Sequence, residues 1–260
     1  MTYKTFWGIA AVAALVIAAG CGGAKKEEGV AEKAAETAGP VTKVDPATAA
    51  SITGKVAFAG KAPERRRIIM DAEPDCKAMH SSPVYSEEVV VNPNGTLADV
   101  FVYVKAGLEG KNFEPPKEPV TLDQKGCVYR PHVVGVRAGQ AISISNSDPT
   151  THNIHPMPKV NREWNQSQPP KGGNLEKEFS RTEIMIPVKC NVHPWMRSYI
   201  GVVDHPYFAV TGDEGTFELK GLPPGEYTVE AWHEKYGALE QKVRLAPSAT
   251  QTIEFTFKGE

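Results

Sequence analysis

The sequence has no excess of positive charge. Its 29 lysines and arginines stand against 31 aspartates and glutamates, which gives a formal net charge of −2. The short clusters "ERRRII" and "AKKEE" are typical of a solvated surface, and acids offset the second one. Because proteins that bind nucleic acids carry a basic patch or stripe, this balance argues against a nucleic acid partner.

Long apolar runs and long helical periods are also missing. The apolar stretch "FWGIAAVAALVIAA" is too short to span a bilayer comfortably and follows Lys4, as in an export signal. After residue 50 the sequence shows short β-branched runs between Gly, Pro and Asn turns, and no convincing long helix period. This texture predicts an all-β chain made of antiparallel β-sandwiches, and 260 residues allow one large domain or two modest ones.

The apolar stretch ends in "AAGC", which resembles the lipobox of bacterial lipoproteins. The resemblance implies a signal peptide at 1–20 and an acylated Cys21, and Gly22 implies sorting to the outer membrane in a Gram-negative cell. An ordinary secretory signal cleaved nearby is the alternative. Residues 21–50 have almost no large apolar side chain and are expected to form a disordered tether. We therefore expect an exported protein on the periplasmic face of a membrane, held by a lipid anchor.

Cysteine is scarce, with four in the chain. Export implies an oxidising compartment, and assigning Cys21 to lipid leaves an odd number of the others. Cys76 and Cys127 are expected to form a disulfide that ties an N-terminal loop to a sandwich. They could instead form a second metal site with His80 and His132, because each cysteine has a histidine four or five residues further on.

The last cysteine opens the stretch "CNVHPWM", which places Cys190, His193 and Met196 at three-residue steps. By itself this spacing also fits a core that happens to hold soft side chains. Upstream, "NSDPTTHNIHP" places His152 just after a strand and a turn. A blue copper site needs two imidazoles, a thiolate and a weak axial thioether. These four residues supply that set and predict one type 1 copper.

Together, "YRPHVVGVRAGQAISISNSDPTTHNIHP" and "VKCNVHPWMRSYIGVV" resemble the cupredoxin family, most of all its amicyanin- and pseudoazurin-like members. The likeness covers about residues 118–205 and implies a Greek-key cupredoxin domain at 111–205. It implies the same four ligands, with Asn153 supporting the loop that bears the cysteine. His155 ranks second to His152 as a ligand, and Met157 is a weaker axial candidate than Met196.

A copper ion with a full ligand set transfers electrons and does no bond chemistry, so we expect an electron carrier rather than an enzyme. A multicopper oxidase needs His-Cys-His motifs, which are missing, and a dinuclear centre needs a second cysteine where Asn191 and Val192 stand. In the family, the edge of the loop histidine lies in an apolar patch that docks redox proteins. The residues that could form this patch around His193 are Pro156, Met157, Pro158, Pro194 and Trp195.

A second resemblance lies near the C-terminus. The stretch "VTGDEGTFELKGLPPGEYTVEAWHEKYG" is similar to the carboxypeptidase regulatory-like, transthyretin-type β-sandwich. That family's earlier strands read like "ITGKVAFAGKAP" and "ADVFVYVKAG", which precede the metal motif here. We therefore expect 51–110 and 206–258 to form one sandwich with the cupredoxin inserted between them. The alternative is two sequential domains, 51–205 and 206–258. No catalytic constellation appears in the second sandwich, which suggests a scaffold or a partner-binding module.

Three functions compete at this point. The first is a membrane-tethered blue copper electron carrier that passes electrons between redox proteins. The second is a protein that stores, delivers or senses copper, and the third is a scaffold whose cupredoxin is inert. The complete ligand set argues against the third, and only six methionines argue against a Met-rich delivery surface. His205 and His233 are expected to be structural or exposed rather than ligands.

Overall fold

The structure, a computed structural model, describes residues 39–259. The expected signal peptide at 1–20, the acylation site Cys21 and the first part of the tether lie outside these residues. Within the described range, no helix is long and apolar enough to cross a membrane.

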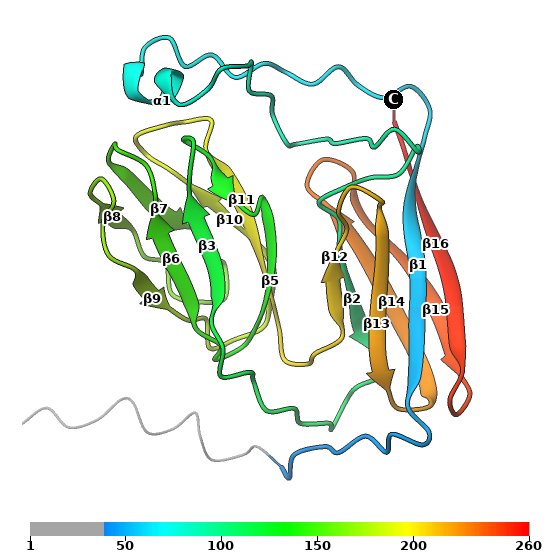
Figure 1. Ribbon diagram of the computed structural model, residues 1–260. Helices are drawn as coiled ribbons and strands as arrows, with labels where there is room; N and C mark the ends of the chain where they lie inside the picture. Colours follow the sequence, from blue (N-terminus) through cyan, green and yellow to red (C-terminus); the bar gives the residue numbers. More distant parts are fainter. Residues whose placement is uncertain (1–38, 260) are drawn as a thin grey trace, which may run out of the picture. The chain divides into compact units, whose positions relative to one another are not determined.

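Nearly all regular structure in the described residues is β-strand, as the sequence predicted, and the strands form two β-sandwiches (Figure 1). The central sandwich has sheets of order β4-β3-β6-β9 and β5-β11-β10-β7-β8. Its strands are β3 (Val120–Gln124), β4 (Tyr129–Arg130), β5 (Val133–Arg137), β6 (Ile142–Asn146), β7 (His152–Pro156), β8 (Gln166–Gln168), β9 (Leu175–Lys177), β10 (Glu183–Lys189) and β11 (Arg197–Val203). Its core packs Leu122 and Ile144 of one sheet against Val136 and Ile200 of the other.

The terminal sandwich takes strands from both ends of the described chain, in sheets of order β13-β1-β16 and β12-β2-β14-β15. Its strands are β1 (Ala50–Ala59), β2 (Phe101–Ala106), β12 (Phe208–Val210), β13 (Thr216–Leu222), β14 (Gly225–His233), β15 (Gly237–Leu245) and β16 (Thr250–Lys258). Figure 1 shows β1 beside the red C-terminal β16. Val56 pairs with Phe255, and Val102 pairs with Ala209 and Ala231. Segments before and after the central sandwich therefore share both sheets.

The first four residues of β2 are buried on both faces, because each face packs against a different core. Val102 and Val104 belong to the core of the terminal sandwich, whereas Phe101 and Tyr103 form a third cluster with residues of the central sandwich. A Cβ atom on Gly201 of β11 would lie 2.7 Å from the Phe101 ring. Glycine at this position is what lets the aromatic ring lie directly on the strand.

The segment between β1 and β2 departs from the expected domain boundary. Ile68, Met70, Met79 and Val84 lie within the range expected for the second sandwich, but they pack against the core of the central one. The segment carries the short helix α1 (Pro74–Ala78), and a disulfide joins Cys76 of this helix to Cys127. The expected disulfide is thus present, and it ties this segment to the central sandwich across 51 positions in the chain.

Candidate metal centre

The loop between β10 and β11 carries Cys190, His193 and Met196. The amide of Cys190 donates to the carbonyl of Met196 at 3.2 Å, and the amide of Met196 donates to the carbonyl of His193 at 3.0 Å. These bonds close the loop on itself and turn the three side chains inward. Cys190 is 3% exposed, and His193 and Met196 are not exposed at all.

His152 is the first residue of β7, which pairs with β10 just before the loop. Successive side chains of a strand point to opposite faces, so His152 and His155 lie on opposite sides of β7. His152 is fully buried, whereas Nε2 of His155 lies 2.6 Å from the exposed carboxylate of Glu163. The strand thus brings His152, and not His155, toward Cys190.

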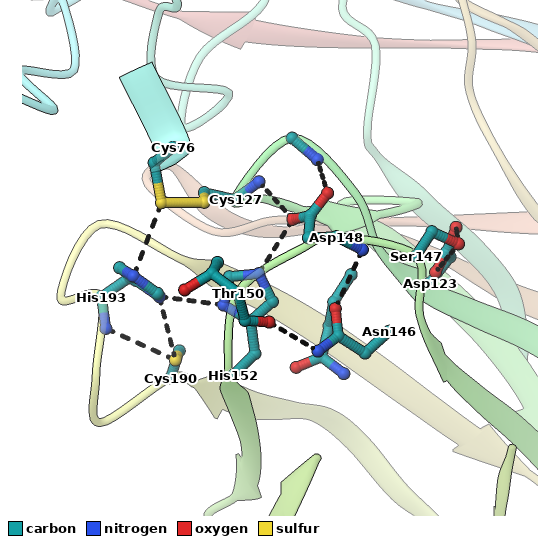
Figure 2. A network of polar contacts seen from close by, with 12 residues as sticks. Cys76, Asp123, Cys127, Asn146, Ser147, Asp148, Thr150, His152, Cys190 and His193 are labelled. Atoms are coloured by element: carbon teal, nitrogen blue, oxygen red, sulfur yellow. Dashed lines mark hydrogen bonds and ion pairs between the residues drawn. A yellow bond between two sulfur atoms is a disulfide. The ribbon is translucent and has the colours of Figure 1, made fainter. Parts of the chain in front are cut away.

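The side chains of His152, Cys190 and His193 point toward one another (Figure 2). The Nδ1 atoms of His152 and His193 lie 2.9 Å apart, and Nδ1 of His193 lies 3.8 Å from Sγ of Cys190. The three donor atoms lie within 4.8 Å of one another. Met196 is buried in the same core cluster as Cys190 and accepts the Cys190 amide with its carbonyl.

Asn153 links the two elements that carry the donors. Its Oδ1 accepts a 2.6 Å bond from the amide of Asn191 and lies 3.3 Å from Sγ of Cys190. The hydroxyl of Tyr129 donates to the Asn153 carbonyl at 2.6 Å. The amide of His193 also points at the Cys190 sulfur at 3.4 Å. The cysteine loop and β7 are thus joined by hydrogen bonds around the sulfur, and this limits how far the donors can move.

Asp148 binds the ring nitrogen of His152 that points away from His193. Nε2 of His152 donates to the Asp148 carboxylate at 2.8 Å, and Nδ1 of the same ring lies 2.9 Å from Nδ1 of His193. The same carboxylate accepts the amides of Gly126 at 2.6 Å and Cys127 at 2.7 Å, as Figure 2 shows. A carboxylate behind a histidine is the usual way to fix the tautomer of a metal ligand.

The electrostatics of the group favour a thiolate. Burial opposes ionisation of Cys190, but hydrogen bonds from His152, His193 and Asn153 outweigh it and lower the pKa of the thiol to about 5. Burial likewise opposes the charge on Asp148, yet its bonds to His152 and to two amides lower the pKa of the carboxyl. These contacts favour the thiolate of Cys190, which is the form that binds metals.

These residues fit copper. Two imidazole nitrogens and one thiolate face each other in a buried pocket, beside a methionine, and soft donors of this kind select copper in a blue-copper arrangement. Cys190 is the single free cysteine within residues 39–259, so its sulfur is not lost to a disulfide.

The edge of the His193 ring was expected to lie in a surface patch, but the ring is fully buried. Sγ of Cys76 lies 3.5 Å from Nε2 of His193, and the Glu73 carboxylate lies 3.9 Å from the same nitrogen. Trp195 stacks obliquely on the His193 ring at 5.3 Å and donates its indole N–H to the Cys127 carbonyl at 2.9 Å. The α1 segment and its disulfide therefore cover His193 together with Trp195, and no local sequence pattern predicts this cover.

The residues of the expected apolar patch differ in their exposure to solvent. Pro156 is buried and Trp195 is only partly exposed, whereas Pro194 is exposed and Met157 and Pro158 are partly exposed. Met157 and Pro194 line a groove together with Cys190 and Tyr199. The open side of the metal centre is thus the Cys190 side rather than the His193 side.

The alternative second metal site does not assemble from the residues named for it. Cys76 and Cys127 are joined by a disulfide. Nε2 of His80 lies 2.8 Å from the Gly126 carbonyl, and Nε2 of His132 lies 2.6 Å from the Glu234 carboxylate. Both rings are therefore engaged elsewhere.

His205 and His233 have structural partners. Nε2 of His205 donates to the Val104 carbonyl at 2.7 Å, and Nδ1 of His233 accepts the Lys235 amide at 3.1 Å. Both rings are buried.

Among the residues near the donors, sequence reasoning missed Asp148 and Glu73. Asp148 follows the strand β6 in the turn "SDP" and precedes His152 by four residues, which is the one local signal that could have pointed to it.

Asp148→Asn is expected to weaken copper(II) binding about 10- to 100-fold, because a neutral amide supports the His152 ring less well than a carboxylate. Competition against a chelator of known affinity measures the change. Asp123→Asn is the matched control, because Asp123 bonds the Ser145 and Ser147 hydroxyls and not His152. Equal affinities for the two variants would contradict the role given to Asp148.

A family model for the carboxypeptidase regulatory-like domain matches residues 201–258. This range covers β12 to β16 of the terminal sandwich, in agreement with the second sequence resemblance. No curated protein sequence matches the chain.

Several solved structures are similar to parts of this chain. A Cu-containing nitrite reductase from Thermus scotoductus is 21% identical over 38% of this chain, with a TM-score of 0.30, and this chain spans 25% of its length. A purple cupredoxin from Nitrosopumilus maritimus is 18% identical over 32% of this chain and 98% of its own, with a TM-score of 0.28. A reduced variant of amicyanin is 22% identical over 34% of this chain and 86% of its own, with a TM-score of 0.30.

Proposed function

We propose that this protein is a type 1 copper protein that transfers single electrons between redox partners. One copper is held by His152, Cys190, His193 and Met196. The observation that carries the proposal is the convergence of two imidazole nitrogens and a thiolate within 4.8 Å, in a pocket that also packs a methionine.

The same geometry favours electron transfer over bond chemistry. Copper, when bound, would supply a one-electron redox couple. The chain's own part is to hold the donors still, through the closed loop, the Asn153 link and the bond from His152 to Asp148. Because the four donors are at most 3% exposed, none is offered to a substrate from solvent. We therefore propose an electron carrier and not an enzyme.

The groove beside Cys190 is the proposed docking side for redox proteins. Its lining includes Met157, Pro187, Pro194, Arg197 and Tyr199. Redox encounters use small interfaces with fast release, so a groove of modest size suffices. A partner docked in this groove lies near the Cys190 sulfur. The His193 ring is fully buried and cannot be contacted by a partner directly.

Export and membrane tethering remain part of the proposal. The "AAGC" stretch supports acylation of Cys21, and the polar residues after it support a tether on the periplasmic face of a membrane. In a Gram-negative cell, Gly22 favours the outer membrane.

Loading the full chain with copper(II) tests the function directly. We expect one copper per chain and an intense absorption at about 600 nm, the energy of a thiolate-to-copper(II) charge transfer. The band should bleach on one-electron reduction and return on oxidation. A colourless protein with weak, exchangeable copper would reject the electron carrier and favour a copper storage, delivery or sensing protein.

A further inference from the structure

The imidazole of His193 has a sulfur atom near each of its nitrogens. Nδ1 lies 3.8 Å from Sγ of Cys190, and Nε2 lies 3.5 Å from Sγ of Cys76 (Figure 2). The second sulfur belongs to the disulfide with Cys127. The sulfur atoms of both disulfide cysteines and a ring nitrogen of His193 lie within 4.8 Å of one another, and all three residues are fully buried.

We propose that reduction of the Cys76–Cys127 disulfide creates a second metal site for copper(I), made of the two thiolates and Nε2 of His193. The ligand class follows from softness, since thiolates select monovalent copper over harder ions. This site shares His193 with the site of the proposed function but does not use Cys190 or His152.

The neighbouring side chains identify His193 as the third ligand. His80 is close to Cys127 in space, but its Nε2 is bonded to the Gly126 carbonyl. The His132 ring is held by Glu234. Glu73 lies 3.9 Å from Nε2 of His193, but a carboxylate is a hard donor and a poor match for copper(I). His152 lies within 4.8 Å of the Cys127 sulfur, but its Nε2 is bonded to Asp148. His193 is the histidine that the described residues group with both sulfurs.

The chemistry needs a reductant, which we identify as a dithiol. One dithiol gives two electrons and two protons to the disulfide, and it leaves as its own disulfide while Cys76 and Cys127 become thiols. Binding of copper(I) then releases the two thiol protons and forms two thiolate–metal bonds. Copper(I) itself undergoes no change of oxidation state in this step.

The test uses the full chain with the substitution Cys190→Ser, which disables the first site and leaves the second intact. The protein is treated with dithiothreitol, freed of it under anaerobic conditions, and titrated with copper(I) against a colorimetric chelator. Alkylation followed by peptide mass analysis reports which thiols the metal protects, and it separates Cys21 from the other two. We expect one tightly bound copper(I), with Cys76 and Cys127 protected, in the reduced chain and none in the oxidised chain.

His193 and His80 provide matched substitutions in the Cys190→Ser background. His193→Gln should weaken copper(I) binding by about tenfold or more, equivalent to about 1.4 kcal/mol, whereas His80→Gln should not. Equal affinity for the His193→Gln and parent chains would overturn the site, because any thiol pair would then suffice. A disulfide that resists dithiothreitol in the folded chain would overturn it as well. Neither result bears on the blue band of the wild-type chain, which tests the proposed function separately.

Discussion

Cys190→Ser is expected to abolish the absorption at about 600 nm of the copper(II)-loaded chain completely, because that band requires a thiolate bonded to copper. The serine hydroxyl is a weak, protonated donor where the wild-type thiol has a pKa of about 5. Absorption spectra of wild-type and variant chains, loaded and washed identically, measure the effect.

The two histidines of β7 provide the matched comparison. His152→Gln should also remove the band, because it takes away one of the converging nitrogens. His155→Gln should leave the band in place, because that ring faces Glu163 on the opposite side of the strand. A band that persisted in Cys190→Ser and vanished in Cys76→Ser would show that the sulfur ligand has been assigned to the wrong cysteine.

Replacing both Cys76 and Cys127 by serine is expected to lower the free energy of unfolding by about 4 kcal/mol. The estimate comes from the chain entropy that a cross-link between residues 51 positions apart removes from the unfolded state. Urea unfolding followed by tryptophan fluorescence measures the loss, since Trp164 and Trp195 both pack on the central core. Wild-type chain whose disulfide has been reduced, without copper(I), should show a similar loss of stability.

The same variant should expose His193, because the disulfide holds α1 over its ring. Carbethoxylation mapped by peptide mass should modify His193 in the double variant and spare it in the oxidised wild type. A loss of less than about 1 kcal/mol, or a His193 that stays protected, would show that packing of Met70 and its neighbours holds the segment without the cross-link.

The strand pattern of the terminal sandwich was readable from the sequence. Thr216–Leu222 alternates exposed and buried side chains, and this period-two signal needs no knowledge of the partner strands. The resemblance placed β2 in this sandwich correctly, but its side chains do not alternate in polarity and so do not show that it contacts a second core. One face of β2 packs in the terminal core, and the other packs on the central sandwich at Gly201. Both contacts involve residues that are distant in the sequence.

The sequence by itself determined the candidate donors. Cys190, His193 and Met196 lie on one short loop, and a loop this short fixes the spacing of its ligands locally. The tertiary structure alone decided what surrounds them. Cys76 contacts His193 across 117 positions in the chain, and Asp148 matters only because a turn brings its carboxylate behind His152. Long-range packing therefore closed the His193 side and left the Cys190 side open, since no local pattern specifies which distant segment covers a loop.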